Sequence, residues 1–132
     1  MGIGEYVSQD IQAVTQLIQT YFDGLHEGDT QKLGTVFHEL CNVYSINEEG
    51  GVRIVPRAQW LELVASRPSP KSRGLARAGR IVSLDLTGPE MAFVKVELSI
   101  HPRYYTDCLT MLRSKDGDWR VVSKTFRMDV KE

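Results

Sequence analysis

The sequence has few cysteines and no motif that binds a metal. Its 132 residues include two cysteines, Cys41 and Cys108, which lie far apart in the chain. Such a pair gives neither a disulfide framework nor the ligand spacing of a zinc site, and no HExxH or CxxC pattern is present. We therefore expect no metal and no cofactor. Cysteine usage of this kind fits a reducing compartment and predicts a cytoplasmic protein.

Long apolar runs are also missing. Residues 1–6 carry neither the positively charged region nor the apolar core of a signal peptide, and no later run approaches the ~20 apolar residues of a membrane span. The chain is 42% apolar and 25% charged, with a formal net charge of -1, which is typical of a globular protein. At this length we expect a single domain over residues 1–132 that is not attached to a membrane.

Positive charge is concentrated in one stretch, from Arg53 to Arg80. Seven basic residues fall there against one acidic residue, Glu62. Aromatic residues are not interleaved with them as they are in proteins that stack on bases, so we expect no nucleic acid partner. A solvated basic surface and a surface that attracts an anionic small ligand both remain open.

The N-terminal part of the chain predicts two helices that meet at a corner. Apolar residues recur there at spacings of three and four: Ile11, Val14, Leu17, Ile18, Tyr21, Phe22 and Leu25. This pattern indicates a helix that Gly28 can end in a left-handed conformation. Asp29 can then cap a second, shorter helix that carries Leu33, Val36 and Phe37.

A hairpin and a third helix are expected next. The runs 41–46 and 52–55 favour strands and flank the turn-forming residues 47–51. Pro56 ends the hairpin, and the apolar spacing around Trp60 predicts a helix over 57–65.

The rest of the chain predicts a meander of long strands. Apolar and polar residues alternate over 75–86, 91–100, 104–112 and 119–128, with tight turns at 87–90 and 115–118. Helices followed by paired strands predict an α+β fold with a curved, mostly antiparallel sheet.

Apolar residues near Leu109, Met111, Leu112, Val121 and Val122 occupy both strand parities. In a sheet with one face exposed to solvent, every second residue of a strand points to that face and is polar. We therefore expect both faces of this sheet to be covered. Helices cover one face. We predict that a second copy of the chain covers the other, as in a two-fold homodimer through the sheet.

The order and length of these elements resemble the nuclear transport factor 2-like superfamily of cone-shaped α+β domains, also described as a cystatin-like roll. The resemblance covers nearly the whole chain and is clearest in residues 21–29, 33–38 and 118–124. Within the superfamily the chain looks most like the small bacterial, SnoaL-like branch labelled putative lumazine-binding, to which residues 60–61 and 67–70 are also similar. The resemblance implies a pocket between the helices and the concave face of the sheet.

Laid over the steroid isomerases of this superfamily, the chain matches their site at one position only. Tyr21 falls on the tyrosine of the oxyanion hole, whereas the general base falls on Ser45 and the protonated acid on Thr110. Serine and threonine have no pKa near neutrality and can replace neither group. The sequence therefore argues against steroid isomerisation.

Three residues of the helical half are candidates for the site. Tyr21 lies on the apolar stripe of its helix, as either a core ring or a hydroxyl donor to a ligand. His38 follows the second helix near the expected pocket mouth, as either a residue favoured by the helix dipole or a proton carrier. Trp60 either packs the third helix on the sheet or stacks on a flat ligand.

Three further candidates lie on the strands. Lys124 shares its strand parity with Val122 and Phe126, and a lysine on an apolar face needs an anionic partner or a route to water. It is either a structural ion pair or a cation that binds a ligand. Cys108 and Thr110 share a parity on the neighbouring strand and either line the pocket or belong to the core.

These residues lead to three hypotheses about function. The first is a small-molecule-binding pocket for a mostly apolar or aromatic ligand with an acidic group, held by Tyr21, Trp60, Cys108, Thr110 and Lys124. The second is an enzyme of the polyketide-cyclase, dehydratase or isomerase type, in which Tyr21 polarises a carbonyl and His38 moves a proton. The third is a dimeric protein-interaction module.

Overall fold

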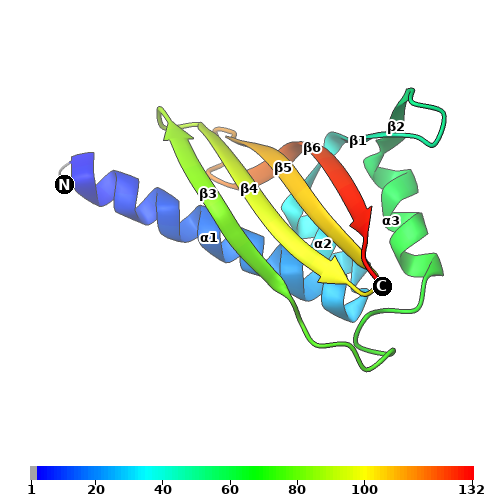
Figure 1. Ribbon diagram of the computed structural model, residues 1–132. Coiled ribbons are helices and arrows are strands. Elements are labelled where there is room, and N and C mark those ends of the chain that lie inside the picture. The colour runs from blue at the N-terminus through cyan, green and yellow to red at the C-terminus, as the bar shows by residue number, and fades with distance from the viewer. Residues whose placement is uncertain (1–2) are drawn as a thin grey trace.

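Three helices lie on one side of a curved six-stranded sheet in the computed structural model, which describes residues 3–132 and the side chains from Val7 onward (Figure 1). The helices are α1 (Ile3–Glu27), α2 (Thr30–Val36) and α3 (Arg57–Ser66). The strands are β1 (Phe37–Ile46), β2 (Val52–Pro56), β3 (Gly79–Thr87), β4 (Met91–Ile100), β5 (Arg103–Arg113) and β6 (Trp119–Val130). This arrangement confirms the predicted α+β fold.

The sheet has the strand order β2-β1-β6-β5-β4-β3. The β3–β6 meander is antiparallel throughout, as predicted, and β1 joins it by pairing parallel to β6. Helix α1 runs across the back of the meander, and its first turns extend beyond β3, while α3 stands beside the β1–β2 hairpin (Figure 1). We call the face toward the helices the inner face and the opposite one the outer face.

The corner between α1 and α2 forms as predicted. Gly28 has φ 67°, a left-handed conformation that glycine adopts without steric cost, and it lets the chain turn directly after α1. One carboxylate oxygen of Asp29, Oδ1, accepts hydrogen bonds from the amides of Gln31 and Lys32 at 3.0 and 3.1 Å. These contacts satisfy two amides that lack a partner within the first turn of α2.

Two predicted boundaries were wrong. Phe37 is not part of α2, because its backbone is extended and it opens β1, although its ring still packs in the core. The strand expected from Leu75 begins only at Gly79. Residues 67–78 instead form turns closed by backbone hydrogen bonds such as that from the amide of Gly74 to the carbonyl of Lys71, at 3.1 Å. Alternation of apolar residues does not distinguish such turns from a strand.

A bulge in β6 changes which side chains face inward. Thr110 pairs with Ser123, but the next residue of β5, Met111, pairs with Val121, so Val122 has no partner across this step. Val121 and Lys124 therefore both face inward although their strand parities differ, and both are buried. The bulge is one reason why apolar residues occupy both odd and even positions in this part of the sheet. The other is that the outer face carries exposed apolar side chains, which are described below.

Candidate functional site

A buried charged pair lies on the inner face, where α1, α3 and the sheet meet. Asp107 of β5 is fully buried, and Lys124 of β6 is 6% exposed. The nearest carboxylate oxygen of Asp107, Oδ2, is 3.9 Å from the ammonium nitrogen of Lys124. Their positions follow from the register, because Leu109 faces Lys124 directly and Asp107 is the next inward-facing residue along β5.

Tyr21 of α1 completes a polar cluster with this pair. Its hydroxyl donates a hydrogen bond of 2.5 Å to Oδ2 of Asp107. Burial and the adjacent carboxylate both raise the pKa of Tyr21 well above its ordinary value, since each disfavours a phenolate. The hydroxyl therefore remains protonated and committed to Asp107.

Aromatic rings surround the ammonium group of Lys124. Its nitrogen lies 4.3 Å from the centre of the Trp60 ring, 5.2 Å from that of Tyr21 and 5.5 Å from that of Phe126. These distances are in the range of cation–π attraction. Burial nevertheless lowers the pKa of Lys124, and the Asp107 carboxylate opposes that shift.

The cluster leaves one strong acceptor without a partner. Oδ1 of Asp107 is buried and receives no hydrogen bond from any residue in the range 7–132. A buried acceptor of this kind costs on the order of 1–3 kcal/mol, and more when it is charged. Such an oxygen is a place where a ligand or a water with a hydrogen-bond donor is stabilised.

The structure brings three of the predicted site residues together and separates the others from them. Tyr21, Trp60 and Lys124 meet at the cluster. Cys108 and Thr110 lie on the outer face, because inward-facing Asp107, Leu109 and Met111 alternate with them along β5. Their expected place beside Lys124 was wrong, since the prediction chose the other strand parity.

His38 does not join the cluster either. It follows the inward-facing Phe37 in β1, so its side chain is directed to the opposite side of the strand. Its Nδ1 accepts a hydrogen bond of 3.0 Å from the amide of Leu40. The geometry therefore does not support an enzyme in which Tyr21 and His38 act on one substrate, because the Tyr21 hydroxyl is also bound to Asp107.

The sequence analysis missed Asp107 as the partner of Lys124. The signal was present, because Asp107 is the one acidic residue in the apolar set of β5 that also holds Leu109 and Met111. A lysine on the apolar face of the neighbouring strand needs an anionic partner. On β5, the alternate residues that include Asp107 supply one, whereas those that include Cys108 and Thr110 do not. Cys41 was also missed; it is buried near Lys124, and burial raises the pKa of its thiol to about 11.

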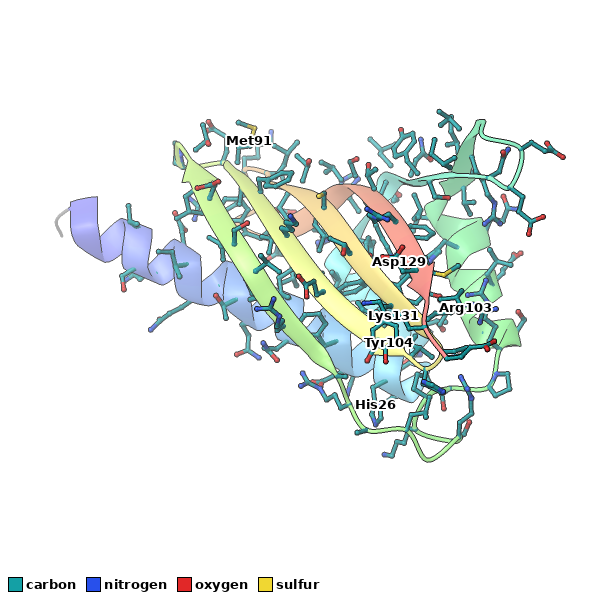
Figure 2. All side chains as sticks on the ribbon, viewed as in Figure 1. His26, Met91, Arg103, Tyr104, Asp129 and Lys131 are labelled. Carbon is teal, nitrogen blue, oxygen red and sulfur yellow. The ribbon has the colours of Figure 1, made fainter. Side chains whose placement is uncertain are left out.

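Two hollows are lined by residues other than those of the charged cluster. Between α1, β4 and the 67–78 segment lies a cavity of about 20 Å³, lined by residues that include Phe22, Pro70 and Leu98. Its volume suits about one water molecule. A larger hollow of about 450 Å³ lies across one end of the sheet and is lined mainly by polar groups of the outer face. Figure 2 shows Tyr104, Asp129 and Lys131 together at this end, and Met91 at the other.

The structure gives no sign of a metal centre or a membrane-spanning helix in the part of the chain that it describes. Within residues 3–132, no three side chains of the His, Cys, Asp or Glu type gather where they could hold a metal ion. No helix over the same range is both long and apolar enough to cross a membrane.

Comparison with known families and structures gives a consistent result for the fold. A family model described as "Putative lumazine-binding" matches residues 9–127. A search of the curated proteins finds no match. Among solved structures, a protein from Silicibacter pomeroyi described as NTF-2 like and of unknown function is 24% identical, with a TM-score of 0.75 over 93% of this chain and 98% of that one.

Two other structures extend the comparison. An NTF2-like protein of unknown function from Shewanella baltica is 16% identical, with a TM-score of 0.80 over 92% of this chain and 95% of that one. A ketosteroid isomerase-like protein from Erwinia carotovora atroseptica is 12% identical, with a TM-score of 0.66 over 89% of this chain and 94% of that one. The TM-scores show that this chain has the nuclear transport factor 2-like fold, and at these identities they show the fold alone, which does not assign an activity.

Proposed function

We propose, from the premise that this chain belongs to the putative lumazine-binding family, that it binds a flat aromatic small molecule with an acidic group at the cluster of Tyr21, Trp60, Asp107 and Lys124. The observation that carries the proposal is the buried charged pair with an unused acceptor. A purely structural ion pair of this kind is often no more stable than apolar packing, so stability alone does not account for it.

Each polar group of the cluster has a role in this proposal. The acidic group of the ligand pairs with the ammonium of Lys124, which lies 3.9 Å from Asp107 and therefore lacks a close hydrogen bond to it. An N–H or O–H of the ligand donates to Oδ1 of Asp107, which is otherwise unpartnered among the described side chains. The ligand ring stacks against Trp60. Lumazine, a flat pteridinedione with N–H and C=O groups, has the chemistry for the last two contacts.

Binding requires part of the fold to move, because Tyr21, Trp60, Asp107 and Lys124 are buried and none of them lines either of the two hollows described above. Helix α3 is the element suited to this movement. Trp60 is its one buried residue, and Leu61, Leu63 and Val64 are half-buried. A displacement of α3 would separate Trp60 from Lys124 and open the cluster from the side of the 67–78 segment.

Calorimetric titration tests this proposal with two probes, lumazine and 2-naphthoate. We expect saturable binding of at least one probe by the wild-type protein, and binding weakened about tenfold or more in Lys124→Met and in Trp60→Leu. Trp60→Leu keeps the charged pair intact and covers the case in which Lys124→Met is poorly folded. Lys95→Met is the matched control, because Lys95 faces outward on β4 opposite Cys108.

Two results would overturn the proposal. One is the absence of heat of binding for both probes with the folded wild-type protein. The other is unchanged affinity in both Lys124→Met and Trp60→Leu. A cytoplasmic location accompanies the proposal as a prediction from cysteine usage, and fractionation of the producing cell would test it.

A second candidate, a dimeric interaction module, is favoured by the outer face of the sheet. That face carries side chains that are between 39% and 67% exposed: Ile46, Val52, Ile54, Met91, Phe93, Tyr104 and Leu112. Apolar side chains gathered on one face mark a surface for association. We propose that a second copy of this chain covers it, which is compatible with ligand binding on the inner face.

A further inference from the structure

Burial makes the amino group of Lys124 easier to deprotonate than that of a solvated lysine. Aromatic rings enclose it on several sides, and its side chain is 8% exposed. Across residues 7–132, no oxygen accepts a hydrogen bond from it, and the nearest carboxylate oxygen is 3.9 Å away. An ammonium has three N–H donors that water satisfies in solution. At 8% exposure the side chain keeps little contact with water, which disfavours the charge.

Charged and titratable groups face this nitrogen from every element packed around it. Asp107 approaches from β5, Tyr21 from α1, Cys41 from β1, and Arg67 from the end of α3. Asp107 favours the ammonium, whereas burial and the like charge of Arg67 disfavour it, and the net effect lowers the pKa of Lys124. The thiol of Cys41 stays neutral near pH 7, since its pKa is about 11.

A carboxyl group beside this amine supplies the second requirement of imine chemistry. Asp107 is fixed by the hydrogen bond from Tyr21 to Oδ2, and its other oxygen receives no hydrogen bond from the described residues. An amine that attacks a carbonyl must lose a proton, and the resulting hydroxyl must gain one to leave as water. A carboxylate adjacent to the amine can accept and return that proton.

We infer that Lys124 forms a Schiff base with an aldehyde or ketone on an aromatic molecule, with Asp107 as the proton carrier. This inference rests on the proposed ligand site, because it uses the same cluster and the same class of ring. It differs in the group that meets Lys124, which is a carbonyl carbon rather than an acid.

The reaction balances without an oxidant or a reductant. The lone pair of Nζ forms a bond to the carbonyl carbon, and the π pair of the C=O bond moves to oxygen. Asp107 accepts a proton from nitrogen and delivers it to that oxygen, which gives the neutral carbinolamine. Asp107 then carries the remaining N–H proton to the hydroxyl as the C–O bond breaks and the C=N bond forms. Water leaves, and the product is the neutral imine of Lys124.

Other lysines of the chain lack this setting. Lys32 is exposed, forms an ion pair of 2.8 Å with Glu27, and has a raised pKa because of that contact. Its amino group is protonated and solvated near pH 7. Lys32 is therefore an internal reference for the reactivity of an ordinary lysine in the same sample.

Reductive trapping tests the inference. The protein is incubated at pH 7 with 2-naphthaldehyde and sodium cyanoborohydride, which donates hydride to the imine and leaves a stable secondary amine. Peptide mass mapping then gives the labelling rate at each lysine. We expect Lys124 to be labelled severalfold faster than Lys32, since burial lowers the pKa of Lys124 whereas the contact with Glu27 raises that of Lys32. Added 2-naphthoate, which has the same ring without the aldehyde, should slow labelling at Lys124 alone.

The controls separate this inference from the proposed function. Lys95→Met should leave labelling of Lys124 unchanged, whereas Asp107→Asn should slow it more than it slows labelling of Lys32. If 2-naphthoate binds but Lys124 is labelled no faster than Lys32, the Schiff base is excluded and the binding proposal stands. If 2-naphthoate does not bind while Lys124 is selectively labelled, the inference holds and the proposal that Lys124 binds an acidic group of the ligand is overturned. If neither occurs in the folded protein, both are overturned.

Discussion

Aromatic rings, rather than a full set of hydrogen bonds, hold the charged pair of Lys124 and Asp107 inside the fold. The two groups therefore depend on each other for charge neutrality, because Asp107 is fully buried. When one partner of a buried pair is removed, the remaining charge loses its compensation. The consequences of single and double substitutions at this pair should differ accordingly.

We expect Lys124→Met to lower the free energy of unfolding by roughly 3–5 kcal/mol, since it leaves the Asp107 carboxylate buried and uncompensated. The double variant Lys124→Met/Asp107→Asn should recover more than half of this loss. Its amide is neutral and its oxygen still accepts from Tyr21. Urea denaturation measures both, with Lys95→Met as the control that should change stability by no more than about 0.5 kcal/mol. A double variant as unstable as Lys124→Met would show that charge compensation is not the cause.

Cys41 should make stability fall in alkaline solution. Burial raises the pKa of its thiol from 9.0 to about 11 in the folded protein. Between these values the unfolded chain loses its thiol proton while the folded chain keeps it, so the folded state binds more protons and stability decreases as pH rises. Its contribution is fully present below pH 9 and is lost by about pH 11.

Urea midpoints measured from pH 8 to 11 test this dependence. Cys41→Val should show a shallower decline than the wild-type protein over the window from 9 to 11. Cys108→Val is the control, because Cys108 is half-buried on the outer face and should leave the decline unchanged. Identical slopes in all three proteins would contradict the assignment to Cys41.

For helices, strands and turns, prediction from the sequence is most accurate where residues close together in the chain determine the backbone conformation. The Gly28–Asp29 corner and the turns of the meander depend on residues within a few positions of each other, and they form as expected. The start of β3 was predicted four residues too early, because the alternation in residues 75–78 belongs to the turn-containing 67–78 segment. Periodicity alone cannot tell such a segment from a strand.

The candidate site was predictable only in part, for a physical reason specific to sheets. Tyr21, Trp60 and Lys124 each stood out as a polar or aromatic residue on an apolar stripe. Choosing Asp107 over Cys108 and Thr110 required the pairing register, because a shift of one residue exchanges the two faces of a strand. The bulge at Val122 depends on contacts between β5 and β6 that the pattern of either strand alone does not reveal.

The Asp29 cap gives a prediction for α2. Asp29→Ala removes the acceptor of two amide hydrogen bonds at the start of a helix of seven residues, and it should lower the free energy of unfolding by about 1 kcal/mol. Thermal denaturation followed by circular dichroism measures the loss. Asp85→Ala is the control, since Asp85 is an exposed residue within β3 and caps no helix. Equal losses in the two variants would mean that the effect is one of net charge.

On the scale of the whole molecule, the two faces of the sheet have different consequences. The inner face is closed by the helices and carries the charged cluster. The outer face has no other element of residues 3–132 over it (Figure 1). If two copies associate through it, Phe93 and Leu112, which are 41% and 43% exposed in the single chain, become buried. The copies then protect Cys108 on the same face.

Substitution of Phe93 by glutamate should therefore separate the copies without unfolding either one. A two-fold interface buries both new carboxylates together, and desolvating each costs several kcal/mol. Sedimentation velocity at micromolar concentration should give twice the chain mass for the wild-type protein and the chain mass for Phe93→Glu. Ile11→Glu is the matched control, since Ile11 is 42% exposed and lies on α1 rather than on the outer face of the sheet. If the wild-type protein has the mass of a single chain, the homodimer prediction is wrong and a different protein would have to cover this apolar face. Cys108 would then react freely with thiol reagents in the isolated chain.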